Sequence, residues 1–219
     1  MTPQEFVRTQ TTIAQAPLVP EIALHLTSEI TPIWQASEAW LAQQGVAPPF
    51  WAFAWPGSQA LARLVLDEPA RVAGLRVLDF AAGGGLAAIA CARAGAALVE
   101  AAEIDPLAEA AIAANAALNA MPVRLAGDVL GADCRWDLIL CGDVFYEAPM
   151  TGRILPWLRR MARHCTVLVA DPGRAYVPAS GLVALGRQRV PTTRELEDRD
   201  ERLVTLFRLL PQDHAPHAG

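Results

Sequence analysis

The 219-residue sequence contains no lysine, so all 18 of its basic residues are arginines. Acidic residues number 23, and the formal net charge is -5. A chain with this balance lacks the basic field that neutralises a run of phosphates, which nucleic-acid binding normally requires. The composition therefore argues against a nucleic acid as substrate or partner.

Cysteine is scarce, and its four positions, Cys91, Cys134, Cys141 and Cys165, are scattered along the chain. None of them forms the close paired spacing that a zinc site or a redox dithiol requires. We expect four reduced cysteines and no metal site.

Long apolar runs are also missing. No uninterrupted apolar stretch reaches the length that spans a membrane, and the N-terminus lacks a basic segment followed by an apolar one. These absences predict a cytosolic protein with no membrane partner, and we expect a monomer.

The hydrophobic content of 53% and the length suit one domain with one sizeable core. Residues 1–49 are rich in Thr, Gln, Pro and Ala, with short amphipathic patterns at 21–26 and 34–44. We predict that they form a partly helical extension packed on the core, and that residues 50–219 form the main domain.

Short apolar runs alternate with longer alanine-rich segments after residue 75, which is typical of βαβ units around a mostly parallel sheet. The predicted strands are 75–80, 97–103, 123–126, 136–141 and 166–170, and the predicted helices are 85–94, 107–119 and 155–163. Segments 181–190 and 202–209 alternate apolar and polar residues around a charged turn. The pattern therefore predicts a Rossmann-like α/β fold that closes with an antiparallel hairpin.

A glycine-rich turn follows the first predicted strand, in the sequence VLDFAAGGGL at 77–86. Gly83 and Gly85 let the backbone approach a ligand closely and leave helix N–H groups pointing at it. Glu103 lies 20 positions after Gly83, at the end of the next strand, where a carboxylate can accept both ribose hydroxyls of an adenosine. These features suit both a nicotinamide dinucleotide and S-adenosylmethionine.

Asp79, at the tip of the first strand, distinguishes the two cofactors. A carboxylate there would repel the pyrophosphate of a dinucleotide, whereas it would attract the ammonium and sulfonium groups of S-adenosylmethionine. The alternative is that Asp79 only caps the following helix.

Three later positions extend the predicted site. Asp128 follows the third strand, where it can accept a hydrogen bond from an adenine amino group or serve as an ordinary loop residue. Asp143 and Tyr146 follow the fourth strand, beside the crevice where open α/β sheets bind ligands, although an acid there can also be a turn residue.

Trp55 ends an aromatic cluster just before a helix expected to begin near Pro56, and it either covers the cofactor or belongs to the core.

Five segments together resemble the lysine methyltransferases that modify the β-subunit of electron-transfer flavoprotein, a family with bacterial members. The segments are FWAFAWPGSQALARLVLD, VLDFAAGGG, AEIDPLA, WDLILCGDVFYE and DPGR. The resemblance extends over residues 17–210. It implies a seven-stranded methyltransferase sheet with an antiparallel last strand, S-adenosylmethionine as cofactor, and the flavoprotein β-subunit as protein substrate.

Carried over position by position, the resemblance also assigns roles to residues. The cofactor-binding positions are Trp55, Asp79, Ala81, Gly83, Gly85, Glu103, Ile104 and Asp128, and the catalytic positions are Asp143 and Tyr146. Ala81 departs from the family, because it stands at the first glycine of the loop and crowds the ligand by a methyl group.

As a hypothesis, a neutral lysine amine attacks the sulfonium methyl group in line, and positioning dominates catalysis. Asp143 would hydrogen-bond the incoming ammonium, and Tyr146 would shape the channel. Three alternatives stay open: the same cofactor with a small amine or another protein as acceptor, a non-catalytic S-adenosylmethionine-binding protein, and an NAD-dependent oxidoreductase.

Overall fold

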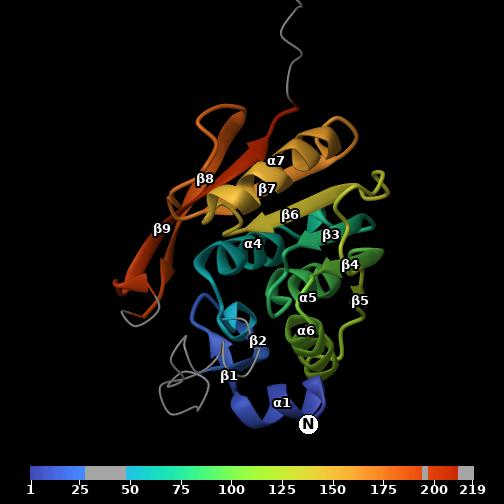
Figure 1. Ribbon diagram of the computed structural model, residues 1–219, viewed down its shortest axis with the longest axis vertical. Helices are drawn as coiled ribbons and strands as arrows, with labels where there is room; N and C mark the ends of the chain where they lie inside the picture. Colours follow the sequence, from blue (N-terminus) through green and yellow to red (C-terminus); the bar gives the residue numbers. More distant parts are fainter. Residues whose placement is uncertain (28–47, 194–196, 212–219) are drawn as a thin grey trace, which may run out of the picture.

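The computed structural model describes residues 1–27, 48–193 and 197–211 of the chain (Figure 1). Their centre is a seven-stranded sheet in the order β5-β4-β3-β6-β7-β9-β8. The strands are β3 (Arg76–Phe80), β4 (Leu98–Ala102), β5 (Arg124–Leu125), β6 (Leu138–Gly142), β7 (Thr166–Asp171), β8 (Leu182–Pro191) and β9 (Glu201–Leu209).

The pairs among β3 to β7 are parallel, whereas β9 runs antiparallel to both of its neighbours, β7 and β8. The predicted Rossmann-like sheet with an antiparallel closing strand is thereby confirmed. The strand order reverses at β3, which has β4 on one side and β6 on the other. In open α/β sheets the crevice at such a reversal, outside the carboxyl ends of the strands, is where ligands bind.

Both faces of the central strands β3, β6 and β7 are buried, because alternate residues of these strands enter two different cores. Val77 and Leu140 pack with α4 (Pro56–Asp67) and α5 (Leu86–Arg93). The next residues of the same strands, including Leu78, pack in the second core with α7 (Ala148–Met161). A strand that is buried on both faces shows a continuous apolar run, which is how these strands could be recognised in the sequence.

The remaining long helix, α6 (Pro106–Leu118), begins close to its predicted position. Helix α7 begins seven residues before the predicted start at 155. Pro149 lies in its first turn, where the missing N–H of proline has no intrahelical partner to lose.

The described part of the N-terminal extension is helical at its start, but the amphipathic pattern at 21–26 is not part of a helix. A short helix, α1 (Pro3–Gln10), is followed by an antiparallel hairpin of β1 (Thr12–Ala16) and β2 (Val19–Leu26), so residues 21–26 form a strand and no helix. Ile22 and Leu24 alternate with more exposed neighbours along β2, and a pattern of only six residues does not separate the two periods. The predicted pattern at 34–44 lies outside the described residues.

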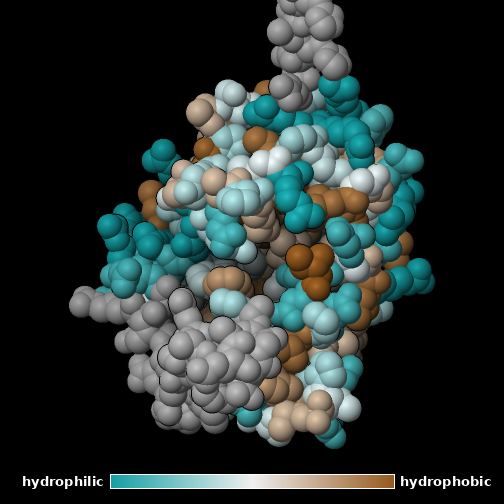
Figure 2. All heavy atoms as spheres, in the orientation of Figure 1, coloured by the Kyte–Doolittle hydropathy of each residue, from teal (hydrophilic) through white to brown (hydrophobic). Residues whose placement is uncertain are grey.

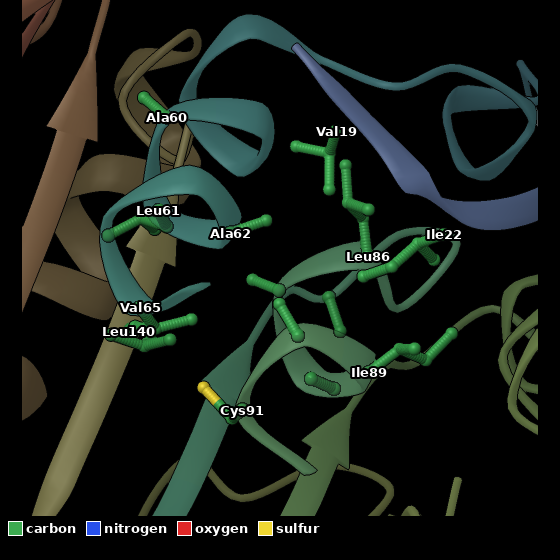
Figure 3. Close-up of a cluster of buried hydrophobic side chains, with 14 of the residues drawn as sticks. Val19, Ile22, Ala60, Leu61, Ala62, Val65, Leu86, Ile89, Cys91 and Leu140 are labelled. Atoms are coloured by element: carbon green, nitrogen blue, oxygen red, sulfur yellow. The ribbon is translucent and has the colours of Figure 1, made fainter. Parts of the chain in front are cut away.

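The β1–β2 hairpin contributes to the first core. Figure 3 shows Val19 and Ile22 of β2 beside Leu86 and Ile89 of α5, and all four side chains are buried. None of the helices in the described ranges is long and apolar enough to cross a membrane.

Candidate active site

A cavity of about 750 Å³ opens at the carboxyl ends of β3, β4 and β6, and Figure 2 shows the molecule hollowed on this face. Eight of the ten residues predicted for the site line this cavity: Trp55, Ala81, Gly83, Glu103, Ile104, Asp128, Asp143 and Tyr146. The two others, Asp79 and Gly85, do not line it. The fold therefore brings residues that are up to 91 positions apart in sequence to one cavity.

The glycine-rich turn connects β3 to α5 and has an unusual backbone. Gly83 (φ +55°) and Gly85 (φ +80°) both adopt left-handed conformations, which favour glycine. Gly84 packs so closely that a Cβ atom on it would lie 2.8 Å from the carbonyl oxygen of Trp51. The Asn115 side chain donates a hydrogen bond of 2.8 Å to the Gly84 carbonyl, so the turn is held from α6 as well.

Ala81 also adopts a left-handed conformation, with φ +54°. Beside the extra methyl group, which the sequence already indicates, this alanine has a backbone conformation in which an L side chain clashes with its own backbone. The cost is about 1 kcal/mol or more. Strain of this kind often occurs at ligand-binding sites.

Ala81→Gly should therefore raise the Tm of the protein by about 2–4 °C, because relief of about 1 kcal/mol produces a shift of that size in a chain of this length. It should also tighten binding of S-adenosylmethionine severalfold, since the lost methyl group no longer crowds the cavity. Thermal unfolding and calorimetry measure the two effects. Ala120→Gly is the matched control: Ala120 has φ +53° but does not line the cavity, so it should gain stability with no change in affinity. Equal affinity of the Ala81→Gly variant and the original protein would contradict the prediction.

Glu103 ties the glycine-rich turn to the end of β4. Its Oε1 accepts the N–H of Gly83 at 2.7 Å, and its Oε2 accepts the N–H of Ile104 at 3.2 Å. Burial raises the pKa of Glu103, and these two backbone N–H groups oppose that rise. A carboxylate has about four acceptor positions, so two remain for hydroxyl groups of a ligand.

Asp79 lies near the end of β3 but does not line the cavity. Its side chain is buried below the turn, at 3% residue exposure, and Oδ2 accepts the N–H of Ala88 at 2.9 Å in the first turn of α5. This contact supports the capping alternative, and direct contact of Asp79 with a cofactor stays a prediction. Burial, with a smaller contribution from the charge of Glu103, raises the pKa of Asp79 to about 8.

The raised pKa predicts how Asp79 affects stability. In the absence of ligand the folded protein holds a proton on Asp79 up to about pH 8, whereas the unfolded chain loses it near pH 4. The folded state therefore binds more protons between these values, and stability falls as the pH rises through this window. Asp79→Asn keeps an oxygen that can accept the Ala88 N–H but has no proton to lose. Its Tm should fall less than that of the original protein between pH 5 and pH 8, and parallel Tm curves would contradict this reasoning.

An aromatic wall forms one side of the cavity. Trp55, the N-cap of α4, donates from Nε1 to the carbonyl oxygen of Phe50 at 2.7 Å. The centre of the Phe50 ring lies 6.0 Å from the centre of the Trp55 ring and 5.8 Å from the centre of the Tyr146 ring. Trp55 is thus part of the cavity wall together with Tyr146, whose residue exposure is 39%.

Asp128 is exposed at the rim of the cavity. Its Oδ1 accepts the N–H of Leu130 at 2.9 Å, a local turn contact. This contact fits the loop role, and within the part of the chain that the structure describes Oδ2 of Asp128 accepts no hydrogen bond that would prevent an adenine contact.

Asp143 lies directly after β6 with φ +56°, a conformation that aspartate tolerates better than most residues. Its Oδ2 accepts the N–H of Gly57 at 2.5 Å, and its Oδ1 accepts Nε and Nη2 of Arg174 at 3.1 and 2.7 Å. A Cβ atom on Gly57 would lie 2.5 Å from the Asp143 carboxylate, so this close approach of α4 requires glycine. Burial raises the pKa of Asp143 to about 6, against the opposing charge of Arg174.

Arg174 and Glu197 complete this part of the site, and no sequence pattern predicted a role for either residue. Arg174 follows β7 and lines the cavity, and Glu197, in the β8–β9 connection, is buried against it. In the sequence, Arg174 is only the last residue of the DPGR segment, one of the five segments that carry the family resemblance. Glu197 belongs to the charged run near residues 195–201, where a carboxylate is usually solvated, so nothing in the pattern marked it.

The arrangement suits a cationic nucleoside. Glu103 can bind hydroxyl groups, the turn at 81–85 allows close backbone approach, and exposed Ile104 offers an apolar face at the rim. Within residues 1–27, 48–193 and 197–211, no group of three or more His, Cys, Asp or Glu is placed to hold a metal ion.

Comparisons with known proteins agree with this geometry. The ribosomal protein L11 methyltransferase family (PrmA) matches residues 59–145. The electron transfer flavoprotein beta subunit lysine methyltransferase of Xenopus laevis is 43% identical over 179 residues, which are 79% of this chain and 71% of that protein. The corresponding protein of Danio rerio is 41% identical over 164 residues, 72% of this chain and 62% of that protein.

Among solved structures, the fold is similar to magnesium protoporphyrin IX methyltransferase (ChlM) from Synechocystis PCC 6803 with bound S-adenosylmethionine. The TM-score is 0.51 at 19% sequence identity, and the match covers 69% of this chain and 79% of that chain. At this identity the likeness shows the fold alone.

Proposed function

Because the chain belongs to the family of electron transfer flavoprotein β-subunit lysine methyltransferases, we propose that it transfers methyl groups from S-adenosylmethionine to a lysine of that flavoprotein subunit. The observation that carries the proposal is the single cavity that joins the glycine-rich turn and Glu103 to Asp143 and Tyr146. A cofactor held at one end of this cavity can meet an acceptor amine at the other.

The cofactor end is built from the turn at 81–85 and from Glu103. When bound, S-adenosylmethionine supplies a sulfonium methyl group that is already a strong electrophile. The free acceptor positions of Glu103 bind the ribose hydroxyls, and its bonds to Gly83 and Ile104 keep its carboxylate at the end of β4. Buried Asp79 adds negative charge below the turn when it ionises, which favours a cationic ligand.

At the acceptor end, Asp143 and Tyr146 receive the lysine. The Asp143 carboxylate has about four acceptor positions. Arg174 occupies two of them on Oδ1 and Gly57 occupies one on Oδ2, so one position on Oδ2 remains for the incoming ammonium. With its pKa near 6, Asp143 is ionised at neutral pH and can orient that group. The proton is lost to water, because an aspartate is too weak a base to hold it. Tyr146 and Phe50 line the approach.

Transfer of labelled methyl groups tests the proposal. Purified flavoprotein and a cell lysate are each incubated with the enzyme and S-adenosylmethionine labelled in the methyl group. We expect label on the β-subunit. The enzyme has no lysine of its own, so any label on its own band cannot be on a lysine side chain. Label on another lysate protein and not on the β-subunit would show that the proposed acceptor is wrong. Cofactor binding without any transfer of label would favour a non-catalytic protein. The predicted cytosolic location stays a prediction.

Asp143→Asn should lower kcat on the accepted protein about tenfold, because the ammonium then meets a neutral amide in place of a carboxylate. Asparagine tolerates the left-handed backbone, but its NH₂ group has to face either the Gly57 N–H or the Arg174 donors, so turnover is measured below the unfolding transition of the variant. Unchanged turnover would remove Asp143 from the mechanism.

A further inference from the structure

The connection between β8 and β9 returns to the site and contributes a buried carboxylate. The side chain of Glu197 is 1% exposed, although it comes from a run of charged residues that would otherwise be solvated. Its backbone N–H donates to the carbonyl oxygen of Thr193 at 3.0 Å. Glu197 does not line the cavity, so any influence on the reaction has to pass through a neighbouring residue.

That neighbour is Arg174. Oε1 of Glu197 accepts Nη2 of Arg174 at 2.5 Å, and Oε2 accepts Nη1 at 3.2 Å, which is a two-point contact along one edge of the guanidinium. Oε2 also accepts Nε of Arg202 at 2.8 Å. A two-point contact sets the plane of the guanidinium as well as its position.

The adjacent edge of the same guanidinium, which shares Nη2 with the first, faces the site. Nε and Nη2 of Arg174 both bond to a single oxygen of Asp143, and the group lies 5.6 Å from the centre of the Trp55 ring. Two donors on one oxygen allow the guanidinium to pivot, whereas the two-point contact with Glu197 does not. The orientation of Arg174 toward Asp143 is therefore set from the β8–β9 connection.

We propose that Glu197 is a positioning residue for methyl transfer: it fixes the Arg174 guanidinium, which holds the Asp143 carboxylate in the orientation that receives the acceptor amine. The inference rests on the proposed function and adds a residue from outside the cavity to it. A gain in stability alone is a poor reason for such a cluster, because buried ion pairs are on average no more stabilising than apolar packing.

A double-mutant cycle tests this role. The four proteins are the original, Glu197→Gln, Asp143→Asn and the double variant, assayed below the unfolding transition of all four and normalised to bound cofactor. Glu197→Gln should lower kcat about tenfold and leave the Kd for S-adenosylmethionine unchanged. In the Asp143→Asn background the same change should lower kcat less than twofold, because its effect passes through the Asp143 carboxylate.

The Tm losses should be more than additive, whereas the kcat losses should be less than additive. Asp143 and Glu197 carry like charges on one shared partner, Arg174, so each single variant loses an attraction but also relieves the repulsion between the two carboxylates, and the double variant gains that relief only once. The double variant should therefore lose more Tm than the sum of the single losses. Glu201→Gln, which removes an exposed partner of Arg189, is the control and should leave kcat unchanged.

An equal loss of kcat from Glu197→Gln in both backgrounds, or rate losses that follow the Tm losses, would overturn the positioning role. Failure of the original protein to methylate the flavoprotein would overturn only the proposed acceptor. The cycle is then measured on the protein that the lysate assay labels, with the same expected and contrary results.

Discussion

Arg174→Met is expected to lower the stability of the protein by about 3–5 kcal/mol, because it leaves the buried carboxylates of Asp143 and Glu197 without their shared partner. Their side chains are 8% and 1% exposed. For a chain of this length the loss corresponds to a decrease of about 10 °C in Tm at pH 7.5. Thermal unfolding of the two proteins measures it.

The control is Arg189→Met, which breaks a pair with Glu201 in which the side chains are 76% and 45% exposed. Such exposed pairs contribute about 0–1 kcal/mol. The Arg174→Met effect should also shrink below about pH 6, because protonated Asp143, with its raised pKa, no longer needs a cation beside it. Equal Tm losses in the two arginine variants would show that the buried cluster is not the source.

Glu103→Gln is expected to raise the Kd for S-adenosylmethionine about 100-fold. The carboxylate can make two charge-assisted hydrogen bonds to ribose hydroxyls, each contributing about 1.5–3 kcal/mol. The amide has one acceptor oxygen, and its NH₂ group would face the N–H of Gly83 or of Ile104, which the carboxylate now accepts. Calorimetric titration with the cofactor measures the change.

Glu109→Gln is the matched control, since Glu109 contributes to the charge around Glu103 but does not line the cavity. It should change the Kd less than threefold. If both variants bind the cofactor with similar affinity, the effect of Glu103 is only that of a nearby charge, and its direct contact with ribose is wrong.

The cavity could largely be predicted because the carboxyl ends of parallel strands meet at one edge of a sheet. Once the apolar runs indicate β3, β4 and β6, the residues that follow them must lie close together. Gly83, Glu103 and Asp143 therefore reach one cavity in the structure from three separate segments.

The details within that edge were less predictable. The direction of the Asp79 side chain, toward α5 and away from the cavity, depends on how the first turn of α5 packs on β3. The left-handed backbone of Ala81 is equally hidden, because alanine gives no sign of a positive φ in the sequence.

The sequence by itself determined where the strands of the sheet lie along the chain, the glycine-rich turn and the acidic residues that follow the strands, since these depend on local apolar patterns and on backbone chemistry. Only the tertiary structure decided that Arg174 joins Asp143 to Glu197, across 31 and 23 positions of the chain. The physical reason is that a buried charge finds its partner through the packing of distant segments, and a run of charged residues looks the same whether it lies in water or against the site.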